Sequence, residues 1–122
     1  MRGILFFCHG ARLDSWRQPF DAILAQSLRE RPDIPAALAF LEMMKPDLFD
    51  AVAQLHAQGA LGIDVIPLFL APGSHTQRDL PQLLDDARQR WPELTFRVAP
   101  TLTESPAVRE AIVKVAFANV PK

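Results

Sequence analysis

Two histidines follow apolar segments of the chain, and an imidazole at either place could bind a divalent metal ion or accept a proton. His9 comes directly after the apolar run 4–8, and His75 ends the loop 71–74, which follows the apolar run 65–70. Such runs are typical of strands buried in a parallel sheet. Ligands of open parallel sheets lie beyond the carboxyl ends of the strands. We therefore predict that His9 and His75 share one metal ion or one substrate.

Other residues near the two histidines are candidates for the same site. Glu42 follows the apolar segment 38–41 and could supply an oxygen ligand or move a proton, although an ordinary carboxylate in a turn is the alternative. Gly10 and Gly73 permit close approach of the backbone to a ligand, although a tight turn is their commoner role. Polar groups for substrate contact could come from Arg12, Arg17, Arg78 and Ser74.

Four further residues carry reactive or aromatic groups, but we predict structural or solvent-exposed positions for them. Cys8 adjoins His9, but alternation along a strand directs the two side chains to opposite sides, so we predict a small buried hydrophobe at Cys8. His56 lies in a polar helical stretch and is predicted to be solvated. Trp16 and Phe20 are predicted to pack where the first helix begins; an apolar wall beside the cleft is the alternative.

Short apolar runs alternate with amphipathic stretches, which is typical of a parallel α/β sheet. The apolar runs predict strands at 3–8, 36–41, 63–70 and 95–98. Pro67 lacks a ladder donor, so we expect a bulge or an end of pairing there. Helical spacing and caps predict four helices: 19–30, a second from near Pro46 to Gly59, a third from a cap at Thr76 to Trp91, and a fourth after a cap at Ser105 that buries Val108, Ile112 and Val115.

These elements predict a single α/β domain over residues 1–122, with one four-stranded parallel sheet and helices on both faces. Right-handed crossovers favour the flavodoxin-like, doubly wound strand order 2-1-3-4. In that order the first and third strands are neighbours, and the chain reverses direction between them. His9 and His75 follow these two strands, so the topology itself predicts that they meet.

Composition narrows the classes of function. A net charge of −1 offers no electrostatic case for nucleic acid or an anionic membrane. No apolar run approaches the ~18 residues of a membrane span, and the first residues lack the layout of a signal peptide. Cys8 is the only cysteine, so no intrachain disulfide can form. These features favour a cytoplasmic protein.

The motifs together resemble those of the short CbiX-type sirohydrochlorin chelatases, a class II chelatase family. The resemblance covers nearly the whole chain and rests on the loop 9–12, the segment 38–42, and the run 67–75 followed by Asp79-Leu80-Pro81. It departs from the family at Ala11, where serine is common, and at Ser74, where a second glycine is common. Neither departure falls on a histidine, but the family's substrate contacts at these two loops do not carry over to this sequence.

The resemblance implies insertion of a divalent metal ion into sirohydrochlorin without nucleotide hydrolysis. Cobalt, the first expectation, leads to cobalamin, iron to sirohaem and nickel to the methanogenic cofactor. His9 and His75 match the family's active-site histidines, and the metal is a substrate, with no permanently bound cofactor. The resemblance also implies a homodimer that surrounds a tetrapyrrole-sized cleft, and a domain this small could not enclose such a ligand alone.

Two other functions remain open. A metal or tetrapyrrole carrier would bind the same ligands without accelerating any reaction. A histidine phosphatase is the third possibility, because a His-Gly pair follows the first strand; here Cys8 stands where that group has a phosphate-binding arginine.

Overall fold

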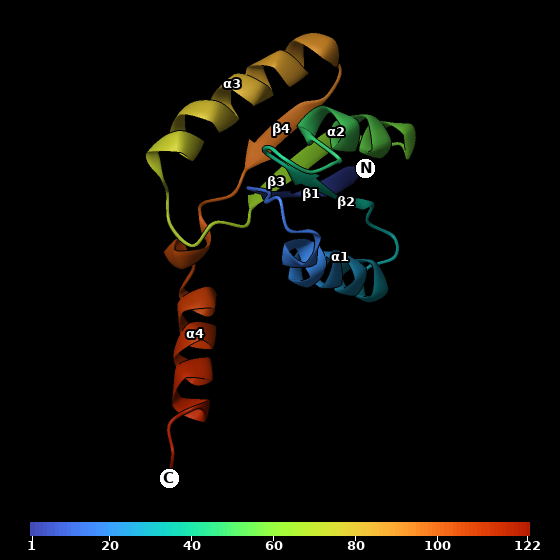
Figure 1. Cartoon of the computed structure of the whole chain (residues 1–122). Helices are drawn as coiled ribbons and strands as arrows, with labels where there is room; N and C mark the ends of the chain where they lie inside the picture. The colour runs from blue at the N-terminus through green and yellow to red at the C-terminus, as the bar shows by residue number, and fades with distance from the viewer.

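The computed structural model has strands and α-helices in alternation, with two short 3-10 helices (Figure 1). The structure describes residues 1–73 and 78–122 in full, and the side chains of residues 74–77 lie outside the described residues. The strands are β1 Arg2–Cys8, β2 Ala36–Phe40, β3 Gly62–Pro67 and β4 Thr95–Val98. The helices are α1 Gln18–Glu30, α2 Leu48–Ala57, α3 Ser74–Arg90 and α4 Pro106–Ala118, and the 3-10 helices are η1 Asp14–Arg17 and η2 Leu102–Glu104.

The sheet is parallel throughout and has the order β2-β1-β3-β4, which confirms the predicted topology. Cys8 of β1 pairs with Phe40 of β2, and Phe7 pairs with Pro67 of β3. The last residues of these three strands therefore meet at one edge of the sheet. The strand β3 ends at Pro67, which has no N–H to donate, and the Leu68 N–H makes one further hydrogen bond to the Phe7 carbonyl at 2.8 Å.

Two apolar clusters hold the layers together. On one face, α2 and α3 cover the sheet, and the fully buried side chains there include Leu5, Ile63 and Val65 of the strands and Val52 and Leu55 of α2. On the other face, α1 covers the β2 side of the sheet, where Cys8, Leu38 and Phe40 pack with Trp16 and Phe20. Buried aliphatic strands with helices on both faces are the expected solution for a parallel sheet.

The ends of the helices follow local chemistry. The α2 helix begins at Leu48, two residues after the predicted start, because Asp47 caps it and exchanges hydrogen bonds with Asp50 in a capping box. The η1 turn before α1 was not predicted. The α3 helix begins at Ser74, two residues before the cap predicted at Thr76, so the predicted start is wrong; the side chain of Thr76 lies outside the described residues. Across the part of the chain that the structure describes, no helix is long and apolar enough to cross a membrane.

The last helix departs from the prediction. Ser105 caps α4 and Pro106 opens it, as expected, but the predicted burial of Val108, Ile112 and Val115 is wrong. No side chain of α4 is buried, and Val115 is 63% exposed. The helix points away from the sheet (Figure 1). The apolar residues recur at helical spacing, as predicted, but no other described part of the chain buries them.

Candidate functional site at the carboxyl edge of the sheet

His9 and Glu42 lie on neighbouring loops at the carboxyl edge, directly after β1 and β2. The Leu41 N–H donates to the Cys8 carbonyl at 2.8 Å, and the Glu42 N–H donates to the His9 carbonyl at 3.0 Å. The parallel ladder thus continues beyond the strands themselves. It holds the backbones of His9 and Glu42 side by side, as the predicted site requires.

Gly10 lets these two loops touch. Its φ of 103° lies in the left-handed region, and a Cβ there would overlap the carbonyl oxygen of Glu42. The predicted close approach is therefore present, but its partner is the protein's own backbone. Met43, the residue after Glu42, also has a left-handed φ, of 66°, although it carries a side chain. Such conformations are strained and are often found at functional sites.

The ring of Phe69 supports the imidazole of His9. The two ring centroids are 4.2 Å apart with an interplanar angle of 42°. Phe69 is itself only 5% exposed and meets Phe7 edge-on at 6.0 Å. A buried aromatic side chain thus restrains an exposed histidine. Sequence reasoning missed this role, because Phe69 is one apolar residue among several in the run after Pro67.

Most of the residues predicted to line the rim of the site are exposed to solvent. Arg12, Glu42 and Gly73 are exposed. Arg78 is 78% exposed, and its Nε lies 3.7 Å from the carboxylate of Asp79. These positions leave Arg12 and Arg78 accessible to a substrate at the edge of the sheet.

Arg17, the third arginine considered for substrate contact, serves the fold instead. Its guanidinium donates to Asp21 at 3.1 Å and to the Lys45 carbonyl at 2.9 Å. It also lies 4.8 Å from the centroid of the Phe40 ring. These contacts tie α1 to the loop after β2.

His75 and Ser74 lie outside the described residues, so their predicted roles stay predictions. The loop that precedes them follows Phe69, and Phe69 contacts His9. Among residues 1–73 and 78–122, no group of three or more His, Cys, Asp or Glu side chains could hold a metal ion. In this part of the chain His9 and Glu42 therefore form no complete metal site by themselves.

Cys8 is a packing residue, which confirms the prediction. It is 1% exposed, and burial raises the pKa of its thiol to about 12. A thiol held neutral in this way is a poor nucleophile. His56 differs from the prediction of a merely solvated side chain, because its Nε2 lies 3.1 Å from the carboxylate of Glu93.

Two pockets adjoin the edge. One of about 400 Å³ is formed by the loop after β2 and includes Glu42; the other, of about 360 Å³, lies between α3 and the end of β4 and includes Phe69. His9 lines neither of these two pockets and is exposed. The fold is thus a parallel α/β sheet whose carboxyl edge carries an exposed histidine and an exposed carboxylate on adjacent loops.

The CbiX family model matches residues 3–118. The chain belongs to the CbiX family, as the motifs predicted. It is 38% identical over 82 residues to the sirohydrochlorin cobaltochelatase of Methanothermobacter thermautotrophicus, a match that covers 67% of this chain and 57% of that protein. It is 32% identical over 120 residues to the enzyme of the same name from Saccharolobus solfataricus, with 93% and 92% of the two chains covered.

Solved structures share the fold. A putative cobalamin biosynthesis CbiX protein from Marinobacter aquaeolei has a TM-score of 0.86 and 26% identity, and the match covers 97% of this chain and 96% of that one. SirB from Bacillus subtilis with Fe³⁺ has a TM-score of 0.81 and 24% identity. The match covers 98% of this chain and 48% of SirB, so the chain spans about half the length of that protein.

Proposed function

We propose that this chain inserts a divalent metal ion into sirohydrochlorin without nucleotide hydrolysis. The observation that carries the proposal is the position of His9, which rests on buried Phe69 and lies beside Glu42 at the carboxyl edge of the sheet. Relatives at 32–38% identity are named sirohydrochlorin cobaltochelatases, which supports the same substrate and reaction.

Insertion exchanges two pyrrole N–H protons for one M²⁺ ion, so the reaction needs a proton acceptor and a ligand that releases the metal. In our proposal His9 and His75 hold the metal ion first, and each imidazole accepts one pyrrole proton as it releases the metal to the ring. Positioned proton acceptors of this kind are typically worth about 10²–10⁴-fold. Glu42 either adds an oxygen ligand or passes protons to solvent. An incomplete ligand set suits this chemistry, because a fully enclosed metal ion would not be handed on.

The substrate's carboxylates require cationic groups at the rim. We assign this role to the exposed guanidinium groups of Arg12 and Arg78, which can pair with carboxylates in two-pronged geometry. The loops at Gly10 and at Gly73-Ser74 would contact the ring face. The metal is a substrate and not a resident cofactor, with Co²⁺ as the first expectation and Fe²⁺ or Ni²⁺ as alternatives.

The protein acts as a homodimer in this proposal. Exposure of His9 outside the two neighbouring pockets supports it, because one chain alone offers an open surface and not an enclosed cleft. We place the protein in the cytoplasm, with support from a single cysteine that is buried and free.

The test is anaerobic conversion of sirohydrochlorin with Co²⁺, Fe²⁺ or Ni²⁺, followed by absorbance against the uncatalysed reaction. We expect His9→Ala and His75→Ala each to lower kcat/KM by about 10²–10⁴-fold, and Glu42→Gln to cause a smaller loss. His56→Ala is the matched control, because His56 pairs with Glu93 at the opposite edge of the sheet and should retain full activity.

A carrier protein is the alternative that the same assay decides. A carrier would bind the metal or the tetrapyrrole, yet the insertion rate would equal the uncatalysed rate. That result would replace the chelatase assignment. Equal activity of His9→Ala and wild type would remove His9 from the mechanism even if the enzyme were active.

A further inference from the structure

One face of the sheet lies open over β3 and β4. The strand register aligns Ile4 with Asp64 and Phe6 with Ile66, so these side chains share the face that α1 covers near β2. In the described part of the chain no helix covers this face over β3 and β4, and Ile66 on the central strand is only partly buried. Central strands of such sheets are normally buried on both faces. The face therefore lacks a second helix.

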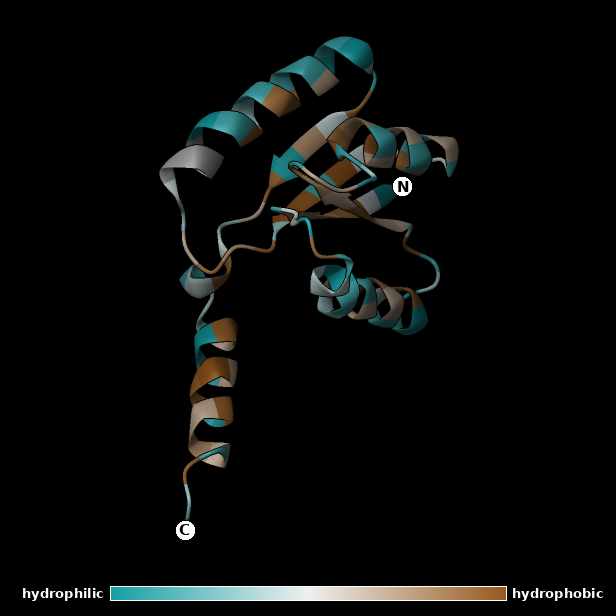
Figure 2. Cartoon of the chain, in the orientation of Figure 1, coloured by the Kyte–Doolittle hydropathy of each residue, from teal (hydrophilic) through white to brown (hydrophobic). Residues whose placement is uncertain are grey.

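The α4 helix has an apolar side that no described part of its own chain covers. Val108, Ala111, Ile112 and Val115 form one continuous stripe along it. Only three of its thirteen residues are charged, and none of its side chains is buried. Figure 2 shows brown recurring from turn to turn of α4, whereas the described part of α3 is mostly teal. A helix this apolar is stable in water only when another surface covers it.

Hydrogen bonds direct α4 away from its own sheet. The N–H groups of Leu102 and Thr103 in η2 donate to the carbonyls of Phe69 and Leu70, each at 3.0 Å. Arg109 in the first turn of α4 donates to the Thr103 carbonyl at 2.9 Å. The start of α4 is thus held at the carboxyl edge. Folding α4 back onto its own sheet would require these bonds to rearrange, whereas a second copy can be met without any change.

The helix and the open face match in length. The thirteen residues of α4 span about 20 Å at 1.5 Å per residue. The six residues of β3 span about 20 Å at 3.3 Å per residue.

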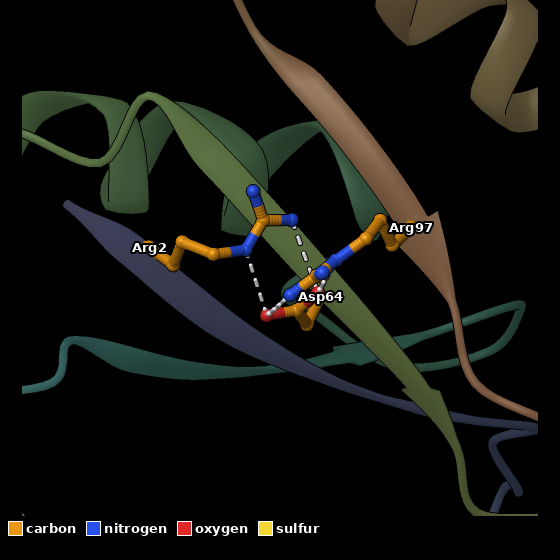
Figure 3. A network of polar contacts seen from close by, with 3 residues as sticks. All are labelled: Arg2, Asp64 and Arg97. Carbon is orange, nitrogen blue, oxygen red and sulfur yellow. Dashed lines mark hydrogen bonds and ion pairs between the residues drawn. The ribbon is translucent and has the colours of Figure 1, made fainter.

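They also match in charge. At the amino end of the open face, Arg2 and Arg97 both pair with Asp64, at 3.0 and 2.8 Å, which leaves one positive charge in excess (Figure 3). The last turn of α4 has no basic residue. The carbonyl end of a helix carries partial negative charge, so α4 docked antiparallel to β3 would place that end near the two arginines.

We infer that two copies of this chain exchange their α4 helices, so that the stripe Val108, Ala111, Ile112 and Val115 of each copy covers the open face of β3 and β4 in the other. The inference rests on the homodimer proposed above and assigns its interface. The α4 helix starts at the edge that carries His9, so exchange brings the two carboxyl edges together. The exposed histidines would then face one shared cleft.

Sedimentation velocity of the full chain tests the interface with two matched variants. Wild type should sediment as a dimer. Val115→Glu places a charge in the stripe, and we expect it to raise the dimer dissociation constant by about 30-fold or more, as truncation of a central interface residue does. Val113→Glu makes the same change on the opposite side of α4, beside Arg109 and Glu110, and should remain a dimer. A monomeric wild type, or a Val115→Glu dimer of unchanged affinity, would overturn the inference.

Cross-linking separates exchange from packing within one chain. The variant Val115→Cys/Ile4→Cys, in a Cys8→Ala background that leaves no other thiol, is treated with a short bis-maleimide. Ile4 aligns with Asp64, about 10 Å from the carboxyl end of β3, and Val115 lies about 14 Å from the start of α4, so antiparallel docking brings the two positions level. A covalent dimer on a denaturing gel supports exchange. An internally linked monomer shows that α4 covers its own sheet and overturns the inference, and so does the absence of any cross-link.

Neither measurement uses chelation, so the two proposals can fail separately. An exchanged dimer that does not accelerate insertion removes the chelatase and keeps the interface. An active monomer keeps the chelatase and removes the interface.

Discussion

The imidazole of His9 lies on the ring of Phe69 with 4.2 Å between the centroids, although one side chain is exposed and the other almost fully buried. A histidine on a loop would otherwise sample several orientations. The aromatic contact restricts them. Such ring pairs are worth about 0.5–1.5 kcal/mol beyond the area they bury, enough to bias an exposed ring.

Phe69→Leu should therefore lower chelation while the fold survives. The leucine keeps the site apolar but removes the ring under His9, and we expect kcat to fall by about 3- to 10-fold, the rate equivalent of the ring contact. In a His9→Ala background the same substitution should have no further effect. Phe96→Leu, a partly buried core change away from His9, is the control. Equal losses from the two leucine variants would show that Phe69 acts only through stability.

Gly10→Ala should separate the His9 and Glu42 loops, because the added methyl would overlap the Glu42 carbonyl. We expect a loss of activity of about tenfold or more, since small displacements of catalytic groups are costly. Gly59→Ala is a matched control: its φ of 97° is also left-handed, but its Cβ would meet only Met1 Cε, at 3.9 Å. It should cost about 1 kcal/mol of stability and leave activity unchanged. Unimpaired chelation by Gly10→Ala would contradict the proposed site.

Asp64→Asn should weaken the fold in a manner that depends on pH. Hydrogen bonds from Arg2 and Arg97 lower the pKa of Asp64 below its usual value. Its contribution to stability is therefore present above the unfolded pKa of about 3.9 and is lost as the pH falls through the lowered folded value. Both arginines are partly exposed, so we expect a loss of only about 1 kcal/mol at pH 7.

Urea denaturation at pH 7 and pH 3 measures this difference, which should shrink at the lower pH. Asp33→Asn breaks a more exposed pair, with Arg31, and should have a smaller effect. A difference between wild type and Asp64→Asn that grows on acidification would contradict the assigned cause.

Cys8 should resist alkylation in the folded protein. With a thiol pKa of about 12, the thiolate fraction at pH 8 is on the order of 10⁻⁴. Iodoacetamide should react only after denaturation, and Cys8→Ala should retain activity. Because the folded pKa exceeds the unfolded one, the thiol also makes stability fall as the pH rises above about 9. Rapid labelling of the native protein at pH 8 would show that the thiol is accessible.

Local signals in the sequence were enough for the elements and their order. Alternating apolar runs indicated the four strands, Pro67 indicated the end of β3, and Ser105 with Pro106 indicated the start of α4. Right-handed crossovers then limited the strand order to the one observed. The edge that carries His9 and Glu42 followed from that order, because parallel strands end on the same side.

Contacts between distant residues could not be obtained in this way. Phe69 under His9 and Asp64 between Arg2 and Arg97 each depend on strand register, which joins positions about 30 to 60 apart in the chain. The sequence identified α4 as an apolar helix because spacing is a local property. Whether its stripe is buried depends on the direction set by η2 and on the surface that the helix meets, and only the tertiary structure decides both.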